Sequence, residues 1–555
     1  MEPPEDGARI ISFTHGEKYH NDLGYEGVDS MAYKKSDKKA NIGSTDMSKR
    51  LFITRLAIIV MLILLQIFFL FIVYGIAKSY VLYWRTSALL LTAFVVLYII
   101  NKPENPAYKL AWVVLVMAVP LVGGIMYVML SGNRTRMKFI REANESHVDI
   151  FKYMPRDKNI QQEIKTISKS ASVQSAYISQ SVGFPAYKNT NVKYFPTGEE
   201  NYARLKEELK LARHFIFMEY FIIKQGKMWE GVLDILKDKA AEGVDVRLIY
   251  DDFGCAMHMP SRFIEEMKSY GIRVVPFNPI EPILSLRQNN RDHRKITVID
   301  GHTGFTGGIN LADEYINIGS KYGHWKDTGI MLKGNGVWNL TVMFLQTWRM
   351  LTNEDEDYTL FIPMKYKRTP IYTDGYVQPY GDTPVDEEIA GENIYLNMIN
   401  KAKHYVYIMT PYLIIDNEMM TALTLAAKSG IDVRIITPGI PDKKMVFMVT
   451  QSYYHELVKA GVKIYQYTPG FVHAKTVVVD DLVATVGTIN FDYRSLYLHF
   501  ECGVWMFNSA AVYEIKEDFL KTQDKCDRIT AKELEKTRGI KRLGQSILRL
   551  VAPLL

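Results

Sequence analysis

The same order of strand-like and helix-like segments occurs twice after about residue 190, and this duplication limits the possible folds of the 555-residue chain more than any other feature. The first copy has predicted strands at 215–223, 244–251 and 272–277, separated by helical stretches that end near residues 242 and 270. The second copy has predicted strands at 405–415, 431–437 and 462–467, separated by helical stretches that end near residues 429 and 460. Alternating strands and helices predict an α/β fold with a largely parallel sheet covered on both faces.

The turns between these segments also match. EGVDVR at 242–247 parallels SGIDVR at 429–434, and YGIR at 270–273 parallels AGVK at 460–463. Two halves of about 170 residues each have the size of ordinary domains. An internal duplication is therefore predicted.

Each half contains the motif HxKxxxxD. Its members are His293, Lys295 and Asp300 in the first half, and His473, Lys475 and Asp480 in the second. Three fixed residue types match a given starting position with a chance of about 1 in 10⁴, so one copy means little. Two copies at equivalent places in a duplicated chain indicate a shared site, and each is followed by a similar turn, GGIN at 307–310 and GTIN at 487–490.

Strand geometry explains the spacing within the motif. A histidine and a lysine two residues apart on a strand point to the same face, about 6.6 Å apart. The aspartate lies seven residues after the histidine, has the opposite parity, and is expected to orient the turn or brace the motif rather than carry a proton.

Two such halves, related by a pseudo-twofold axis, bring two histidines and two lysines around one centre. This set suits a phosphodiester: one imidazole attacks phosphorus, the other protonates the leaving oxygen, and Lys295 and Lys475 hold the phosphoryl oxygens. We expect no metal and no cofactor, because the sequence has no HExxH motif, no cysteine cluster and no dense carboxylate set.

Apolar segments near the N-terminus predict a membrane anchor. The uncharged run 56–77 would reach about 33 Å as a helix, against a bilayer core of about 30 Å. A second uncharged run covers 110–130, and the apolar stretch 86–100 between them is a short span or a re-entrant segment. Basic residues flank both ends, and both flanks favour the cytoplasm, so the number of crossings stays open.

The expected organisation has six parts. They are a polar tail at 1–50, membrane helices at 51–132, a linker at 133–190, the first repeat at 191–370, the second repeat at 371–526 and a basic amphipathic helix at 527–555. The last segment is expected either to lie on an anionic membrane surface or to pack on the catalytic body. The net charge of +6 permits attraction to anionic lipid or to nucleic acid without choosing between them.

The paired motifs resemble those of the phospholipase D superfamily over roughly residues 190–510. Within it, the segments HRKITVIDG, GGINLADEY, MTPYLIID, FVHAKTVVVD and GTINFDYRS resemble bacterial cardiolipin synthases. The resemblance implies duplicated phospholipase D-like halves behind N-terminal transmembrane helices. It also implies a reaction in which two phosphatidylglycerols give cardiolipin and glycerol. The membrane segments predict a plasma-membrane location, and the basic flank at 134–141, which leads into the large domain, favours a cytoplasmic catalytic domain.

The resemblance also implies residue roles. His293 would carry the phosphatidyl group, and His473 would act as acid and then as base. The supporting residues would be Asp327 and Glu501 behind the histidines, with Asn310, Asn490 and Ser495 around the phosphate or its turns. The chain departs from the family in having His499 where an asparagine is more usual, and in an additional apolar segment before the usual hairpin.

Other functions compete with this one. A hydrolytic phospholipase or nuclease would use the same residues with water as the acceptor, and a transferase could use a different headgroup. A non-enzymatic membrane scaffold would predict eroded motifs, and both motifs are intact. The expected partners are phosphatidylglycerol and the membrane, without nucleic acid, and a homo-oligomer is compatible with the sequence.

Overall fold

The computed structural model describes most of the chain after residue 80. The described residues are 81–102, 105–119, 123–124, 126–128, 153–256, 258–260, 262–280, 289–319, 321–362, 375–386, 388–536 and 539–554, with 61, 64, 67 and 68. The predicted tail at 1–50 and most of the predicted span at 56–77 lie outside the described residues.

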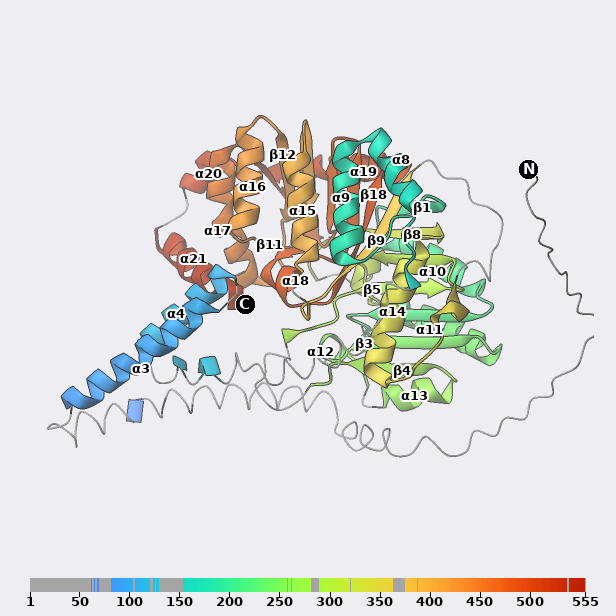
Figure 1. Ribbon diagram of the computed structural model, residues 1–555, viewed down its shortest axis with the longest axis horizontal. Helices are drawn as coiled ribbons and strands as arrows, with labels where there is room; N and C mark the ends of the chain where they lie inside the picture. The colour runs from blue at the N-terminus through green and yellow to red at the C-terminus, as the bar shows by residue number, and fades with distance from the viewer. Residues whose placement is uncertain are drawn as a thin grey trace, which may run out of the picture. The chain divides into compact units, whose positions relative to one another are not determined.

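The first half is a seven-stranded sheet with the order β1-β8-β6-β5-β2-β3-β4 (Figure 1). Its strands are β1 Thr190–Phe195, β2 Phe215–Tyr220, β3 Asp245–Asp251, β4 Arg273–Phe277, β5 Lys295–Ile299, β6 Thr303–Gly307 and β8 Gly329–Gly334. Its helices include α10 Gly198–Lys210, α11 Lys227–Ala241, α13 Phe263–Ser269 and α14 Val337–Thr352. Apolar residues of α10, α11 and α13 form one core with the outer face of the sheet.

The second half is an eight-stranded sheet with the order β19-β13-β12-β10-β15-β16-β18-β9. Its strands are β9 Tyr376–Asp382, β10 Tyr405–Met409, β12 Asp432–Pro438, β13 Lys463–Tyr467, β15 Thr476–Val479, β16 Val483–Gly487, β18 Glu501–Phe507 and β19 Cys526–Arg528. Its helices include α15 Ala390–Lys401, α16 Asn417–Lys428, α17 Lys444–Ala460 and α19 Ala510–Gln523.

The two sheets have matching strand orders, which confirms the predicted duplication. The order β1-β8-β6-β5-β2-β3-β4 corresponds strand by strand to β9-β18-β16-β15-β10-β12-β13. The prediction of largely parallel sheets is wrong. Within these sheets, parallel pairing joins β2 to β3 to β4 and β10 to β12 to β13, whereas the other neighbours are antiparallel. The motif strands β5 and β15 return through tight turns as hairpins, and a hairpin can only be antiparallel.

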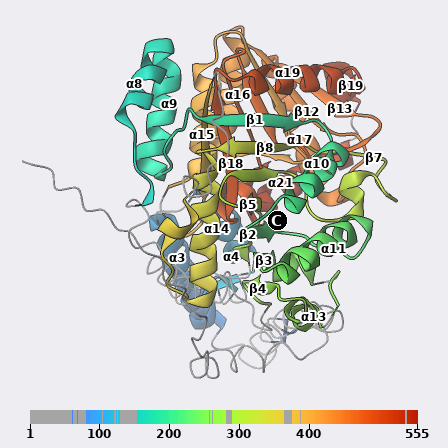
Figure 2. The same cartoon turned by 90° about the vertical axis from the view of Figure 1, so that its right-hand side faces the viewer.

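The sheets share an apolar core in which both halves take part. Phe217 and Leu332 of the first half belong to the same buried cluster as Val478 and Val504 of the second. The last helix of each half packs against a strand of the other: α14 contacts β9, and α19 contacts β1. Helix α19 and strand β1 can be followed in Figure 2. The halves are therefore joined by packing over a wide area as well as at the site.

Part of the predicted linker is structured. Within 133–190 the helices α8 Lys158–Ile167 and α9 Lys169–Tyr177 are followed by the short helix η2 Ile178–Val182. Apolar side chains from all three are buried in the core of the second half, and the Trp505 indole donates to Gln174 Oε1 at 2.9 Å. The apolar residues of α8 recur at helical spacing on one face, whereas α9 buries Ala171 together with the polar Gln174 and Ser175.

The described apolar helices before the body are α3 Val81–Asn101 and α4 Pro106–Ala118, which contact each other. None of the helices in the described part of the chain is long and apolar enough to cross a membrane. Helix α4 covers only the first part of the uncharged run at 110–130, because it ends at Ala118, shortly before Pro120. The Asn105 amide, which caps α4, donates to the Tyr497 hydroxyl at 2.8 Å and so ties this helix to the second half.

The motif aspartates hold the turns that follow the motif strands. Asp300 accepts hydrogen bonds from the backbone N–H groups of three consecutive residues, at 2.9, 2.8 and 3.0 Å, where the chain enters β2. Asp480 accepts the equivalent three bonds at the start of β10, at 2.6, 2.9 and 2.8 Å. Neither carboxylate faces the histidine of its motif, which agrees with the odd spacing.

Replacing Asp300 by alanine is expected to destabilise the fold by about 2 kcal/mol, because buried N–H groups lose a charged acceptor. Thermal unfolding of the purified protein would measure the loss. Asp355→Ala, which removes a carboxylate that is 80% exposed, serves as the control and should leave the midpoint unchanged. An Asp300→Ala midpoint equal to that of the control would contradict the bracing role.

Candidate active site

The two motifs meet in one buried site. His293 precedes β5 and His473 precedes β15, and each residue is 7% exposed. The charges of Lys475 and His473 act on His293 across the interface between the halves. The histidines that the sequence analysis paired on the basis of the duplication are therefore brought together by the fold.

Each histidine is hydrogen-bonded to a carboxylate from the opposite half. His293 Nδ1 lies 2.9 and 3.0 Å from the two oxygens of Glu501, and His473 Nδ1 lies 2.7 Å from Asp327 Oδ2. Both carboxylates are fully buried. When Nδ1 carries the proton and donates it to the carboxylate, Nε2 is left with a free electron pair. The site therefore requires both halves.

Backbone pairing places Glu501 beside His293. The N–H group of His293 donates to Phe500 O at 2.9 Å, and the N–H group of Phe500 donates to Arg291 O at 2.8 Å. This short parallel bridge aligns Asp292, the residue before the motif histidine, with Phe500, the residue before β18. The register of the bridge sets the distance between the ring and the carboxylate.

An equivalent backbone pairing, in which the first half provides the carboxylate, places Asp327 beside His473. Strand β7 (His324–Lys326) pairs in parallel with β14 (Gly470–Val472), and the N–H group of His473 donates to Lys326 O at 2.7 Å. Asp327 directly follows the end of β7. Each histidine is thus held by the strand that carries its carboxylate.

The motif lysines are buried behind the histidines. Lys295 Nζ donates to His293 O at 2.6 Å, and Lys475 Nζ donates to His473 O at 2.5 Å. Burial lowers the pKa of Lys295 to about 8, although Glu501 and Asp327 favour its charged form. Burial lowers the pKa of Lys475 to about 7, against the attraction of Asp327. Two ammonium groups in a buried site create a strong field for an anion.

Both histidines favour the neutral form. Burial lowers the pKa of His293 well below its usual value, and the charges of Lys295 and Lys475 act in the same direction. Burial and Lys475 lower the pKa of His473 to about 4, while Asp327 opposes the shift. A neutral imidazole is the form that can act as a nucleophile or a base.

The turns after the motifs differ by one residue, and the difference has a steric cause. A Cβ atom at Gly308 would lie 2.1 Å from Asp327 Oδ1, so a side chain at this position would displace that carboxylate. The second half has Thr488 at the equivalent position, and its hydroxyl donates to Glu501. The GGIN and GTIN turns therefore both serve the carboxylates, one by leaving space and one by a hydrogen bond.

The expected supporting residues are all near these turns but are used differently. Asn310 accepts from the N–H group of Ile222 at 3.0 Å and donates to the Tyr315 hydroxyl at 2.7 Å, so it holds the turn. Asn490 Oδ1 and Ser495 Oγ are buried and have no hydrogen-bond partner among the described residues. The Asn490 amide oxygen can therefore accept a hydrogen bond, and the Ser495 hydroxyl can donate or accept one.

Aromatic residues that the sequence analysis did not single out line both histidines. The ring of Phe221 lies 5.0 Å from that of His293. The rings of Tyr315 and Trp325 lie 5.4 and 5.6 Å from that of His473. Their positions follow from the strand ends and turns beside the motifs. Only Tyr315 carried a local signal, since it belongs to the GGINLADEY segment.

His499 lies beside His293 and Glu501, a position that its sequence context did not indicate. Its ring is 5.6 Å from that of His293, and its Nδ1 is 3.8 Å from Glu501 Oε1. Nitrogen and oxygen atoms of His293, His499 and Glu501 all lie within 4.8 Å of one another, a spacing compatible with a metal ion. Lys295 and Lys475 share this site, and their charges oppose a bound cation.

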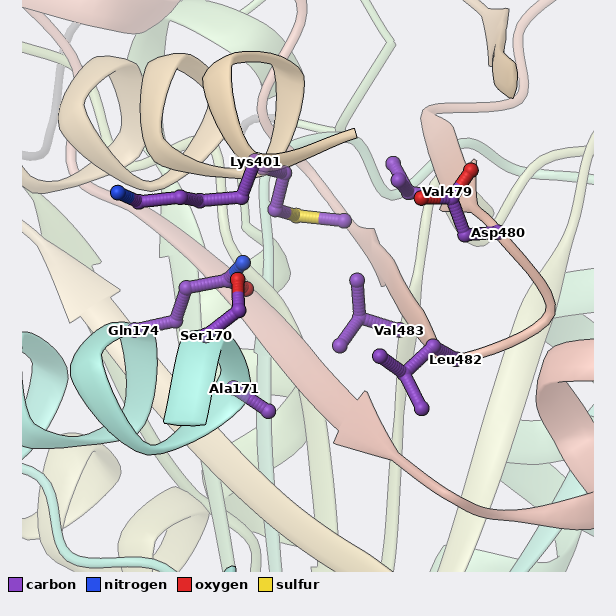
Figure 3. A pocket seen from close by; sticks show the side chains of 9 residues that line it. Ser170, Ala171, Gln174, Lys401, Val479, Asp480, Leu482 and Val483 are labelled. Carbon is purple, nitrogen blue, oxygen red and sulfur yellow. The ribbon is translucent and has the colours of Figure 1, made fainter. Parts of the chain in front are cut away.

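Two other features lie outside the site. Glu392, Asp416 and Glu418 form a second group with metal-compatible spacing, in which the Tyr497 hydroxyl contacts Glu392 and Asp416. The pocket in Figure 3 is lined by residues of α9, α15 and the turn after β15, among them Asp480. That turn is at the opposite end of β15 from His473.

The geometry predicts that the site binds inorganic phosphate. Replacing Lys475 by methionine should weaken binding at pH 6 by about 10- to 100-fold, because one charge-assisted hydrogen bond contributes about 1.5–3 kcal/mol. Isothermal titration calorimetry would measure the affinity. The same substitution at the exposed Lys428 is the control, and equal affinities of the two variants would show that phosphate binds elsewhere.

The sequence matches the family described as "Cardiolipin synthase, PLD-like domain" over residues 205–319 and 395–523, which contain both motifs. Residues 90–132 match "Phospholipase_D-nuclease N-terminal". Among solved structures, the phosphatidylserine synthase of Haemophilus influenzae superposes with a TM-score of 0.51 over 68% of this chain and 97% of that one. The sequence identity is 14%, so this likeness shows the fold.

Proteins of higher sequence identity align with this chain over nearly their whole length. An uncharacterized protein of Streptococcus mutans is 43% identical over 463 residues, which are 83% of this chain and 99% of that protein. A cardiolipin synthase of Halalkalibacterium halodurans is 33% identical over 466 residues, which are 83% of this chain and 92% of that protein. The chain therefore belongs to the cardiolipin synthase family of proteins with phospholipase D-like domains.

Proposed function

We propose that the protein is a phosphatidyltransferase that converts two molecules of phosphatidylglycerol into cardiolipin and glycerol. The observation that carries the proposal is the pair of buried histidines, each hydrogen-bonded to a carboxylate from the opposite half and backed by a lysine. Family membership supports the choice of substrate, since relatives that cover the chain are cardiolipin synthases.

In the first step, His293 Nε2 attacks the phosphorus of one phosphatidylglycerol. A bond forms between nitrogen and phosphorus, and the bond from phosphorus to the glycerol headgroup oxygen breaks. Protonated His473 gives its proton to that oxygen, so glycerol leaves as a neutral alcohol. Lys295 and Lys475 hold the non-bridging oxygens, whose charge increases in the transition state.

In the second step, the free hydroxyl of a second phosphatidylglycerol headgroup gives its proton to neutral His473. The resulting oxygen attacks phosphorus, the nitrogen–phosphorus bond breaks, and His293 returns to its starting state. Glu501 and Asp327 keep the two Nδ1 protons in place through both steps, so that each Nε2 faces the substrate.

The protonation of His473 depends on the substrate. In the free site its pKa is about 4, which favours the base. A phosphodiester anion brought between the lysines offsets part of their positive charge, which raises the pKa of His473 toward the range in which it can act as an acid. Binding of the anionic substrate therefore favours the protonated form of His473 that the first step requires.

The location of the protein is part of the same proposal. The apolar segments before residue 132 would hold the catalytic body at the plasma membrane, with the body in the cytoplasm. The apolar helices α3 and α4 and the match of residues 90–132 to the family's N-terminal region support an attachment there.

Supplying the full-length protein with phosphatidylglycerol alone should yield cardiolipin and glycerol in equal amounts, because both products arise in one cycle. Mass spectrometry of the lipids and an enzymatic glycerol assay would quantify them. Phosphatidic acid with glycerol, in place of cardiolipin, would show that water resolves the intermediate and that the protein is a hydrolase.

Replacing His293 by alanine should lower turnover by at least about 10³-fold and abolish any covalent phosphatidyl adduct, because the nucleophile is lost. Acid-quench trapping with radiolabelled phosphatidylglycerol would detect the adduct. His473→Ala is the matched variant, since it removes the equivalent residue of the other half. An adduct that persists in His293→Ala and disappears in His473→Ala would reverse the two roles.

The ratio kcat/KM for phosphatidylglycerol should fall as the pH rises from about 7 to 9. The pKa values of Lys475 and Lys295 are about 7 and about 8, so both ammonium groups are charged below this range and lose their protons through it. Activity on vesicles across pH 5–9 would give the profile. Lys475→Arg should keep its charge and flatten the alkaline decrease, and an unchanged decrease in this variant would contradict the assignment.

A further inference from the structure

The C-terminal helix α21 (Gly539–Val551) presents a row of apolar side chains to the outside. Ile540, Leu543 and Ile547 are 88%, 63% and 57% exposed, and their spacing of three and four residues places them on one face. Soluble surfaces rarely leave such a row uncovered.

The opposite face of α21 holds the helix to the body. Leu548 packs against the core of the second half, and Ala552, just after the helix, is buried there. The helix contacts α17 and α4, and Figure 1 shows it beside both (Figure 1). The exposed row is therefore not needed to attach the helix, because it points away from the face that packs on the body.

The two helices beside α21 extend the apolar surface. Met445, in the first turn of α17, is 58% exposed. On α4, Leu110 and Met117 are 55% and 64% exposed. The helices that contact α21 therefore expose apolar side chains of their own.

The ionisable side chains of α21 itself are all basic, and one of them, Arg549, is paired with Glu456 of α17 at 3.2 Å. Helix α21 contains Lys541, Arg542 and Arg549 and no acidic residue. Lys443 and Lys444, at the start of α17, are also exposed, and the first turn of α17 contains no acidic residue. Apolar side chains flanked by lysine and arginine match the boundary between acyl chains and anionic headgroups.

We propose that Ile540, Leu543 and Ile547, with Met445 and the neighbouring basic residues, form a docking surface for an anionic lipid bilayer. We call it the α21 surface. Its apolar side chains enter the acyl boundary and its cations contact the phosphates of the headgroups. This contact is separate from the apolar segments before residue 132, and it deepens the proposed function because the bilayer would be the source of both substrates.

A series of side-chain contacts connects the start of α17, beside the α21 surface, to His473. Asp442 accepts a hydrogen bond from the Tyr412 hydroxyl at 2.6 Å, and Lys443 Nζ lies 5.6 Å from the Tyr412 ring. That ring lies 6.3 Å from Phe471, whose ring is 6.0 Å from that of His473. Docking would therefore hold the side of the site near His473 against the headgroup layer.

A fluorescence experiment tests the contact without relying on catalysis. The full-length protein would carry an environment-sensitive dye at Leu543→Cys, in a Cys526→Ser background because the other two cysteines are buried. In phosphatidylglycerol vesicles, lipids brominated on their acyl chains should quench this dye several-fold more than a dye at Leu425→Cys. Leu425, on α16, is the matched control, since it is a leucine of similar exposure at 58%. Equal quenching at the two positions would overturn the proposal, as would energy transfer between copies in place of quenching, which would assign the face to self-association.

A kinetic experiment tests the consequence for access to substrate. Leu543→Glu should lower cardiolipin formation from vesicles by about 10-fold, because a carboxylate replaces an inserted side chain near anionic lipid. It should leave the rate unchanged on short-chain phosphatidylglycerol dispersed as monomers, and Leu425→Glu should match the unaltered protein on both substrates. Equal losses on vesicles and monomers, or no loss on either, would contradict the α21 surface. An unaltered protein that forms no cardiolipin on either substrate would contradict the proposed function, and the quenching result would still decide the docking.

Discussion

Backbone hydrogen bonds between the two halves are the interaction on which the site depends. His293 N bonds to Phe500 O, and His473 N bonds to Lys326 O, in each case one residue before the carboxylate that meets the imidazole. A shift of either pairing by one residue would turn Glu501 or Asp327 away from its histidine, because successive side chains on a strand point to opposite faces. The wide apolar core between the sheets, with α14 and α19 crossing it, keeps this register in place.

Burial gives the site its chemistry. Four ionisable motif side chains and two carboxylates lie together with little solvent, so their charges act on one another at low effective dielectric. Burial keeps the histidines neutral and brings the lysines toward neutral pH. An anionic phosphodiester relieves the mutual repulsion of the lysines, so the same field that disfavours a cation favours the substrate. The motif aspartates take no part in this field and hold the turns instead.

Much of the fold could be predicted because the sequence repeats the same order of strands and helices in both halves. The strands at 245–251 and 432–438 were expected within one or two residues, since buried strands between helices have a clear period. Whether the motif strands run parallel or antiparallel to their neighbours could not be predicted in the same way, because strands joined by a hairpin and strands joined by a crossover have similar apolar sequences. The packing of α8 and α9 on the second sheet was also missed, since short amphipathic helices before a domain resemble a linker.

The sequence by itself identified the repeated motif: the spacing of His293, Lys295 and Asp300 puts the histidine and the lysine on one face of a strand and gives the aspartate the opposite parity, which needs no coordinates. Tertiary structure decided which residues meet. Asp327 and Glu501 exchange partners between the halves, and His499 comes beside His293, because contacts between residues far apart in the chain depend on the register of paired strands. The C-terminal helix is a second example. Its composition was compatible with packing on the body or with membrane contact, and the tertiary structure decided which of its side chains are packed and which remain exposed.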